Sequence, residues 1–374
     1  MKGGISVLSH ATALEFHRAG HDVSVVASCE DWQAARQFDR QQPFRTVRFS
    51  GKLLWRELQI FPACWREIRC FKPDVIWSAL WYPCAVAASY CVKRNGPLQT
   101  VSTYGSEIFI AQSDWKVRLK ARMGFWRRRV FDRCAQIFAL SRYTREKIIE
   151  LGAPPEKIDI VRGGVERGWF DLAPAARNQN ILLTVARLDE HKGHDRVIEA
   201  LPTVAQRYPD LKYVLVGPGG ENWPRLQKIA QDLKVDHMVE YRGAVPFGEL
   251  QKAYQEANVF IMASREMPNR LDLVEGFGLT FLEAATVELP SIAGNSGGVP
   301  DAVEHDVSGL LVDPDSPAAL AEAILTLLDN PEYATRLGRQ GRQRAWDEFR
   351  WETLAGLMLS AFEKRLEERK AARV

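Results

Sequence analysis

The stretch that decides how this chain is interpreted reads Glu275-Gly276-Phe277-Gly278-Leu279-Thr280-Phe281-Leu282-Glu283. Its two glycines let the backbone come close to a ligand and open a helix whose N-terminal N–H groups face that ligand. Glu275 is expected in the loop before the helix and Glu283 in its second turn, at a different depth. Two such carboxylates can accept hydrogen bonds from hydroxyl groups on different rings. The alternative is a solvated helix with two incidental glutamates, which the glycines and the nearby loop Ser296-Gly297-Gly298 disfavour.

A second group of charged residues, Arg187 to Gly193, follows a predicted strand that ends at Val185. Ligands of parallel α/β sheets lie at the carboxyl ends of the strands. Arg187 and Lys192 can neutralise a diphosphate there, the guanidinium as a planar fork and the ammonium as a point charge. Ordinary surface charge is the alternative for these two residues. Gly217-Pro218-Gly219-Gly220 is a third strand-to-glycine turn on the same side, but it lacks the third glycine and the acidic partner of a dinucleotide-binding fingerprint.

Short β-branched runs alternate with longer amphipathic stretches along the whole chain. This alternation predicts an α/β architecture in which helices cover both faces of parallel sheets. The predicted strands cover residues 22–27, 74–78, 99–103, 135–140, 181–186, 212–216, 258–263 and 309–312. The clearest predicted helices cover residues 5–19, 115–133, 193–207, 222–234 and 317–328.

A change of composition between Glu166 and Gln179 marks a domain boundary, because a new strand starts at Asn180. We therefore expect one domain over residues 1–170 and a second over residues 178–350. The stretch from Trp351 to Arg369 predicts one long final helix.

The N-terminus departs from a doubly wound domain, which should open with a buried strand. Here Gly3-Gly4 leads directly into a helical pattern with Val7, Leu8 and Ala11. The first and usually central strand is thus missing, which would leave unpaired backbone groups on two neighbouring strands. We expect from this that the native start lies upstream of Met1. An intact mass of the natively produced protein that matches a start at Met1 would contradict the expectation.

Composition narrows the class of protein. The 374 residues suit two domains, and 46% hydrophobic with 26% charged residues is typical of a soluble globular protein. The net charge of +3 gives no indication of a nucleic-acid partner. No apolar run reaches the roughly 18 to 20 residues of a membrane span, and the N-terminus lacks a secretory signal pattern. All six cysteines lie in the first 134 residues without a CxxC pair, which favours reduced thiols and a cytoplasmic location.

Together these motifs resemble the retaining GT-B glycosyltransferases of family 4, which include bacterial mannosyl- and glucosyltransferases for glycolipids and surface polysaccharides such as lipopolysaccharide. The pair EGFGLxxLE and RLxxxKG is the most specific part of the resemblance. The matching segments span almost the whole length and are Gly3-Gly4, Tyr104-Gly105-Ser106-Glu107, Ser141 to Thr144, Val161 to Glu166, Arg187 to Gly193, Val216-Gly217, Glu275 to Glu283, Ser296 to Pro300 and Gly309 to Val312.

The resemblance implies a fold and a reaction. Two Rossmann-like domains would face each other across a cleft, with the helix in residues 351–374 crossing back to the first domain. The enzyme would move a hexose, mannose or glucose, from a GDP- or UDP-linked donor to a glycolipid or polyprenyl-linked acceptor, with retention. The leaving phosphate would take the acceptor proton, so that neither a protein nucleophile, a metal nor another cofactor is required. Asp313-Pro314-Asp315 is interpreted as a turn and not as a metal site.

The resemblance also implies roles for single residues. Arg187 and Lys192 would bind the donor diphosphate, and Glu283 would hold the ribose hydroxyls. Glu275 and the amides of Gly276, Phe277, Gly278 and Leu279 would hold the transferred sugar. Gly4 would approach the phosphates from the first domain. The base would pack near Val216, Gly217 and the segment from Arg242 to Val245.

Two positions depart from the family pattern. Tyr104 stands where the family usually has a histidine that contacts the donor sugar, and a phenol can donate and accept hydrogen bonds but offers no imidazole. Gly163 stands where asparagine is common. Both departures fall in the N-terminal half of the expected active site. Unchanged transfer by Tyr104→Phe would remove Tyr104 from the site.

The predicted helix within Trp115 to Arg133 is rich in arginine, lysine and aromatic residues, and a similar mixture surrounds Trp55-Arg56 and Trp65-Arg66. Such helices favour anionic membrane surfaces, which suggests a peripheral location at the inner face of the membrane. The alternative is that Trp126, Val130 and their neighbours at helical spacing pack inward while the arginines are solvated.

Two other function classes stay open. A nucleotide-sugar epimerase of the same architecture would turn over donor without acceptor. A nucleotide-sugar binding protein with degraded catalysis would bind donor without turnover. The sequence names neither the base, the sugar nor the acceptor.

Overall fold

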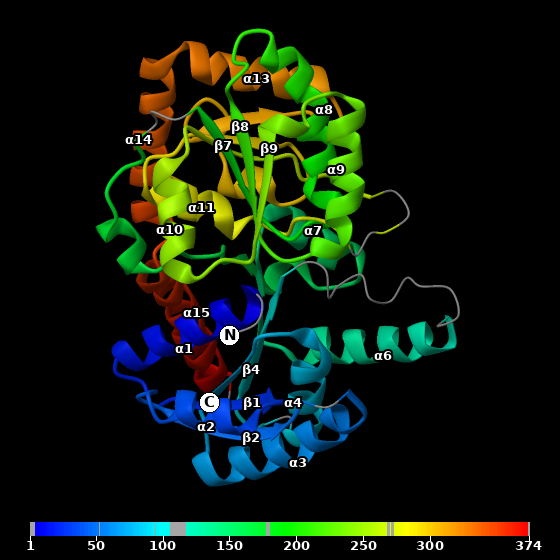
Figure 1. Ribbon diagram of the computed structural model, residues 1–374. Helices are drawn as coiled ribbons and strands as arrows, with labels where there is room; N and C mark the ends of the chain where they lie inside the picture. The colour runs from blue at the N-terminus through cyan, green and yellow to red at the C-terminus, as the bar shows by residue number, and fades with distance from the viewer. Residues whose placement is uncertain are drawn as a thin grey trace. The chain divides into compact units, whose positions relative to one another are not determined.

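The computed structural model describes residues 4–51, 53–93, 95–104, 117–176, 180–267, 270 and 273–372. The chain divides into two compact units (Figure 1). Unit 1 consists of Met1–Arg162 and Trp351–Val374, and unit 2 consists of Gly163–Arg350.

Unit 2 is built on one parallel six-stranded sheet in the order β12-β11-β10-β7-β8-β9. Its strands are β7 (Ile181–Val185), β8 (Lys212–Val216), β9 (Val239–Gly243), β10 (Val259–Met262), β11 (Ser291–Gly294) and β12 (Gly309–Val312). Counted from the first strand of the unit, this is the 3-2-1-4-5-6 order of doubly wound folds. The direction of winding reverses between β7 and β10, and ligands of such sheets bind outside the carboxyl ends of these two strands.

Helices lie on both sides of the unit 2 sheet (Figure 1). They are α8 (His194–Ala205), α9 (Trp223–Asp232), α10 (Phe247–Glu256), α11 (Leu279–Thr286), α12 (Val299–Ala302), α13 (Pro317–Asp329) and α14 (Pro331–Glu348). Because both faces are covered, every residue of β7, β10 and β11 is buried. Leu182 and Ile261 of the sheet pack with Val197 and Leu201 of α8 in the core.

Unit 1 contains two separate parallel sheets. The first pairs β1 (Ser24–Cys29) with β2 (Arg45–Ser50), and the second has β3 (Val75–Ser78), β4 (Leu98–Thr103), β5 (Gln136–Ala139) and β6 (Ile158–Ile160) in that order. Within the described residues the chain starts with helix α1 and no strand precedes it, as the sequence predicts. The sheets of unit 1 separate between β1 and β3, where that first strand would lie in a doubly wound sheet.

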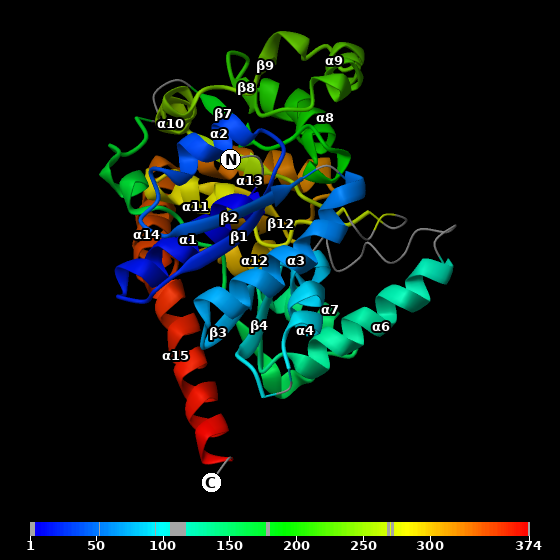
Figure 2. The same ribbon diagram turned by 90° about the horizontal axis from the view of Figure 1, so that it is seen from below.

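The helices of unit 1 are α1 (Gly4–Arg18), α2 (Trp32–Asp39), α3 (Leu53–Phe71), α4 (Val86–Cys91), α6 (Val117–Arg133), α7 (Arg142–Glu150) and the C-terminal α15 (Trp351–Ala371). Helix α15 runs beside α1 (Figure 2). Met358 and Phe362 of α15 share a core with Phe16 of α1 and Phe138 of β5. Of the helices that the structure describes, none combines the length and the hydrophobicity that a membrane span needs.

Candidate functional site

The connections that follow β7 and β10 contact each other at the point where the unit 2 sheet reverses its direction of winding. The backbone N–H of Arg265 donates to the carbonyl of His191 at 2.9 Å. The Arg265 guanidinium also holds both carboxylate oxygens of Asp195, the second residue of α8, at 2.9 Å, and both side chains are buried. A bidentate buried pair of this kind fixes the orientation of both partners. It therefore holds the two ligand-side connections in register.

Lys192 and Glu275 form an ion pair across these connections. The ammonium lies 2.5 Å from the carboxylate, and the two side chains are 13% and 15% exposed. Burial raises the pKa of Glu275, but the charge and hydrogen bond of Lys192 and the N–H of Phe277 outweigh it, so that the pKa lies below its ordinary value. Glu275 is therefore a carboxylate paired with Lys192. The resemblance implied a role for each residue, but it did not predict the pair.

Arg187 is the more exposed basic residue, with 64% of its side chain accessible and an ion pair to Asp189 at 2.7 Å. Its backbone carbonyl is hydrogen-bonded to Nε2 of buried His194 at 2.9 Å. Burial lowers the pKa of His194 to about 4. The ring is thus neutral near pH 7, and because a carbonyl only accepts, Nε2 carries the proton. His194 supports the loop that presents Arg187.

His191 is a second buried histidine at the same place. Burial and the charge of Lys192 lower its pKa to about 4, partly offset by Glu275. Its Nδ1 has no hydrogen-bond partner among the described residues. The sequence interpretation assigned no role to either histidine. Their only signal was their place beside the Lys192-Gly193 motif.

The glycine loop, Glu275 to Gly278, leads into α11, and its conformation requires glycine at the residue before the helix. Gly278 has a φ of +98°, and a Cβ there would lie 2.6 Å from the ring of Phe281. Gly278 offers no side chain to cap α11, so the first N–H groups of the helix have no side-chain partner there. The carbonyl of Glu275 accepts from the N–H of Gly298, which joins this loop to the Ser296–Gly298 turn.

The side chain of Phe277 is buried in unit 2 and is not accessible to a ligand. It is 1% exposed and packs edge-on against Phe349, with ring centroids 5.7 Å apart. Only the backbone of Phe277 is available to a ligand, and its N–H lies 3.4 Å from the Glu275 carboxylate. Leu279, the first residue of α11, is half-buried.

Glu283 lies in the second turn of α11, as predicted, and accepts a hydrogen bond from the hydroxyl of buried Tyr254 at 2.7 Å. Burial raises the pKa of Glu283 to about 7; the Tyr254 hydrogen bond opposes this and the charge of Glu166 adds to it. Glu283 therefore titrates near neutral pH. Tyr254, on α10, was not predicted as a partner because it precedes Glu283 by 29 positions.

Gly217 lies beside the carboxyl end of β9, at the same edge of the sheet. The N–H of Gly217 donates to the carbonyl of Gly243 at 2.8 Å, and the hydroxyl of Tyr241 donates to the carbonyl of Gly217 at 3.0 Å. Gly217 has a φ of +145°, and a Cβ there would collide with the Ala186 carbonyl. Val245, two residues beyond β9, is half-buried. The turns after β7, β8 and β9 are therefore neighbours.

Gly163 packs directly against the loop from Glu275 to Gly278 and the start of α11. A Cβ at this position would lie 2.5 Å from Cδ2 of Leu279 and 3.0 Å from the ring of Phe277. The side chains of the glycine loop thus occupy the space that a larger residue would need.

Tyr104 and Gly4 belong to unit 1, and their predicted roles stay predictions. Tyr104 is half-buried and directly follows β4, and Gly4 is the first residue of α1. The rest of that motif, Gly105 to Glu107, lies outside the described residues.

Asp313 sits in a turn. Its side chain accepts from the backbone N–H of Asp315 at 3.0 Å, which is the hydrogen bond of an Asx turn. The described residues contain no cluster of three or more His, Cys, Asp or Glu side chains arranged to hold a metal.

Comparison with known proteins agrees with this architecture. The family model described as "Glycosyltransferase Family 4" matches residues 2–167, and that described as "Glycosyl transferases group 1" matches residues 169–344. Two similar relatives are both named GDP-mannose-dependent alpha-(1-6)-phosphatidylinositol monomannoside mannosyltransferase. The Mycolicibacterium smegmatis protein is 29% identical over 99% of this chain and 97% of its own length. The Mycobacterium tuberculosis H37Rv protein is 30% identical over 95% of this chain and 93% of its own.

Solved structures share the fold over the whole chain. A glycosyltransferase from Rickettsia africae ESF-5 superposes with a TM-score of 0.80 at 18% identity, covering 98% of this chain and 96% of its own. Anabaena Alr3699/HepE in complex with UDP and glucose gives a TM-score of 0.75 at 16% identity, covering 97% and 96%. With both family models matched and a relative 30% identical over nearly its full length, this chain belongs to the GT-B glycosyltransferases of family 4.

Proposed function

We propose that this protein transfers mannose from GDP-mannose, with retention, to a phosphatidylinositol-based glycolipid at the membrane. The relatives that are 29 to 30% identical over nearly the whole chain carry this donor and acceptor in their names. The observation that carries the proposal is the Lys192–Glu275 pair at the winding reversal of unit 2, beside the open N-terminus of α11. A basic and an acidic group side by side suit a diphosphate joined to a sugar.

Each residue has a proposed role. Arg187 and Lys192 bind the diphosphate, and Glu275 with the amides of Gly276 to Leu279 holds the mannose. Glu283 accepts from the ribose hydroxyls. Gly217 and Val245 adjoin the base. From unit 1, Tyr104 is proposed to contact the sugar and Gly4 the phosphates.

The proposed reaction needs no metal and no protein nucleophile. The bond from the sugar C1 to the phosphate oxygen breaks while C1 bonds to the acceptor oxygen on the same face. The acceptor proton passes to the departing phosphate oxygen, so atoms and charge balance. Lys192 and Arg187 stabilise the negative charge that develops on the phosphate.

The test offers the purified protein GDP-mannose, UDP-glucose and other nucleotide sugars, with phosphatidylinositol mannoside or without acceptor. Of the donors offered, only GDP-mannose is expected to support transfer to the acceptor, and transfer should persist in the presence of EDTA. NMR should show an α-linked product. Donor turnover without acceptor would favour an epimerase, and binding without turnover would favour a degraded enzyme. Transfer only from a UDP-sugar would overturn the proposed donor.

A further inference from the structure

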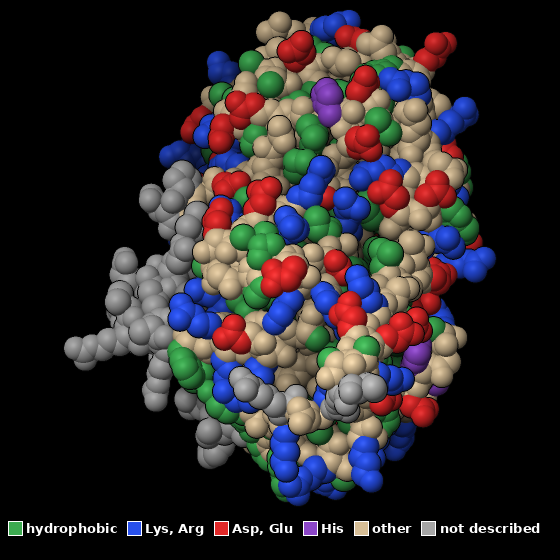
Figure 3. Space-filling model, turned by 180° about the vertical axis from the view of Figure 1, so that it is seen from behind, with side chains coloured by type: hydrophobic (Ala, Val, Ile, Leu, Met, Phe, Trp, Pro, Cys, Tyr) green, Lys and Arg blue, Asp and Glu red, His purple; other side chains and the backbone are tan. Residues whose placement is uncertain are grey.

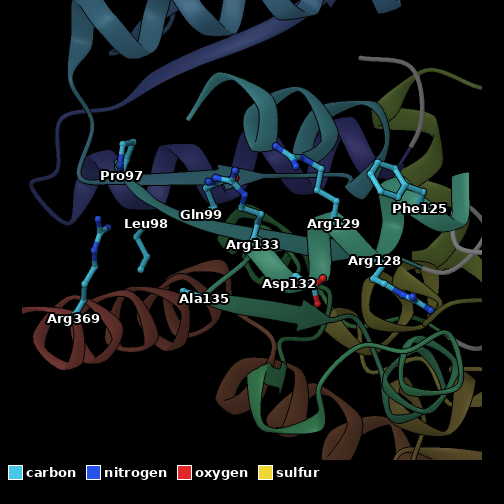
Figure 4. Close-up of a pocket in the computed structure, with 10 residues that line it drawn as sticks. All are labelled: Pro97, Leu98, Gln99, Phe125, Arg128, Arg129, Asp132, Arg133, Ala135 and Arg369. Atoms are coloured by element: carbon cyan, nitrogen blue, oxygen red, sulfur yellow. The ribbon is translucent and has the colours of Figure 1, made fainter. Parts of the chain in front are cut away.

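Unit 1 contains a cavity of about 590 Å³ that the donor site does not explain. Four parts of unit 1 line the cavity (Figure 4). They are the start of β4 with Leu98, the residue before β5, Ala135, the C-terminal part of α6, and Arg369 of α15. Tyr104, by contrast, follows the end of β4. The cavity therefore lies at the amino ends of the strands, whereas the ordinary ligand site of such sheets lies at the carboxyl ends.

The lining is strongly basic. Four of the lining residues are arginines and one, Asp132, is a carboxylate, so the lining carries a net positive formal charge. Among the described residues, neither Arg128 nor Arg369 has a hydrogen-bond or ion-pair partner. On the face of unit 2 in Figure 3, by contrast, acidic and basic side chains are interspersed. Arginines without such partners that line a cavity suit a phosphate, which a guanidinium can bind through two parallel hydrogen bonds.

The other two arginines, Arg129 and Arg133, are held by hydrogen bonds to α4 and the residue after it. Arg129 donates to the hydroxyl and the carbonyl of Ser89 at 3.3 and 3.1 Å, and its guanidinium lies 4.1 Å from the ring centre of Tyr90. Arg133 donates to the carbonyl of Val92 at 3.1 Å. These contacts with α4 and the residue that follows it fix the direction of both side chains, which lowers the entropy that ligand binding would otherwise cost.

Helix α15 brings the fourth arginine to the cavity. Arg365 donates to the side chain of Gln136 at 2.9 Å and to the carbonyl of Glu156 at 3.0 Å, which fixes the last turns of α15 against β5 and the turn before β6. Arg369 follows one turn later. The partial negative charge at the end of α6 would oppose an anion, but Lys157 donates to the carbonyls of Phe131 and Asp132 and offsets it.

Exposed aromatic rings border this basic cavity. Phe125 lines it and is 62% exposed, and Tyr90 is 47% exposed. Tyr90 contacts Phe61 of α3, with ring centroids 6.3 Å apart, and Trp65 of the same helix is 48% exposed. Aromatic rings at the surface beside arginines are typical of proteins that insert into the headgroup layer of anionic membranes. The inward packing that the sequence left as the alternative also occurs, since Val130 is buried.

We propose that this cavity binds the headgroup phosphate of an anionic membrane lipid, with Phe125 and Tyr90 entering the headgroup layer beside it. The proposal rests on the proposed function in one respect, that a lipid acceptor requires the enzyme at a membrane. The docked lipid is distinct from the acceptor, because the cavity lies at the amino ends of the unit 1 strands, away from the carboxyl end of β4 that Tyr104 follows.

The test is flotation of the purified protein with phosphatidylcholine vesicles, with and without phosphatidylinositol. The variant Arg128→Ala/Arg369→Ala removes the two unpaired guanidiniums. The control Arg36→Ala/Arg40→Ala removes the same charge from two exposed positions of unit 1 that do not line the cavity. The wild type and the control are expected to float with the anionic vesicles only, and the cavity variant to partition about 10-fold or more weakly.

Phe125→Ala is expected to weaken flotation while its dependence on anionic lipid stays. The melting temperature and its rise with GDP-mannose should be unchanged in all variants. This result would show that the substitutions leave the fold and the donor site intact. Flotation of a protein that transfers no mannose from GDP-mannose to phosphatidylinositol mannoside would contradict the proposed function and leave this proposal standing. Equal flotation of the wild type and the cavity variant would overturn the proposal. So would stabilisation of the wild type alone by inorganic phosphate without vesicle binding, because the cavity would then bind soluble phosphate.

Discussion

The ammonium of Lys192 donates to the carboxylate of Glu275 at 2.5 Å, although 83 positions of sequence separate them. The pair joins the segment after β7 to the segment after β10. Each side chain neutralises the charge of the other, and both have little access to water. A bound diphosphate would share Lys192 with Glu275. The pair thus keeps both side chains oriented before a donor arrives, which reduces the reorganisation needed on binding.

Lys192→Met should cost both stability and activity. It leaves the Glu275 carboxylate buried without its cation, a loss of about 3 to 5 kcal/mol of unfolding free energy for a pair of this burial. Transfer should fall by about 10²-fold or more, because the leaving phosphate loses a stabilising charge. Urea denaturation and initial rates measure the two effects.

The double variant Lys192→Met/Glu275→Gln separates these effects. Removing both charges should recover most of the lost stability, since no unpaired carboxylate is left. Transfer should stay low. If the double variant is no more stable than Lys192→Met, the ion pair is not what stabilises the loops.

Glu283 should make stability depend on pH. In the folded protein its pKa is about 7, against 4.5 for the ordinary carboxyl group. Between these values the folded state binds more protons than the unfolded state, so the free energy of unfolding falls as the pH rises. Glu283→Gln should remove this part of the decline. Urea denaturation from about pH 5 to 8 measures it, and parallel curves for the two proteins would contradict the raised pKa.

The sequence predicted the local structure of the site better than its long-range contacts. The loop position of Glu275, the second-turn position of Glu283 and the eight named strands all occur in the structure. The glycine and charge patterns that carried these predictions are local. The contacts of Lys192 with Glu275 and of Tyr254 with Glu283 join distant segments, so no spacing in the sequence could reveal them.

Four strands were not predicted, and each has a physical reason. Strand β6 has only three residues. Strand β11 reads Ser-Ile-Ala-Gly, with one β-branched residue, and is strand because both its neighbours pair with it. Strand β9 lies at the sheet edge, where Glu240 and Arg242 are exposed, so it lacks a buried run. Strand β2, Arg-Thr-Val-Arg-Phe-Ser, likewise carries polar residues in a two-stranded sheet. The sequence patterns used to find strands are runs of buried β-branched residues, and none of these four strands contains such a run.

Gly163→Ala should weaken donor binding. The added Cβ would lie 2.5 Å from Leu279 and 3.0 Å from Phe277, so the glycine loop must move. Overpacking of this kind costs about 1 to 3 kcal/mol. The matched control is Gly168→Ala, where a Cβ meets nothing within 4 Å. Thermal-shift titration with GDP should show weaker binding for the first variant only, and equal binding by both would mean that Gly163 does not set the loop position.

His194→Phe should make the position of Arg187 less well defined without leaving a cavity in the core. The aromatic ring fills most of the same buried space, but the Arg187 carbonyl loses its donor at 2.9 Å. A fully buried carbonyl without a partner costs about 1 to 3 kcal/mol, and the partly buried Arg187 carbonyl should lose less because the loop can turn it toward water. Because Arg187 itself stays present but less well placed, the KM for the donor should rise more than kcat falls.

The control for this variant is Tyr213→Phe, which removes the hydroxyl that lies 3.4 Å from Nδ1 of His194 but leaves the bond to Arg187. It should lower the melting temperature slightly, because the Thr184 hydroxyl also loses a partner, and leave the KM near the wild-type value. A KM that rises equally in both variants would trace the effect to general loosening of the core. A KM unchanged in His194→Phe would show that the Arg187 loop holds its shape without the histidine.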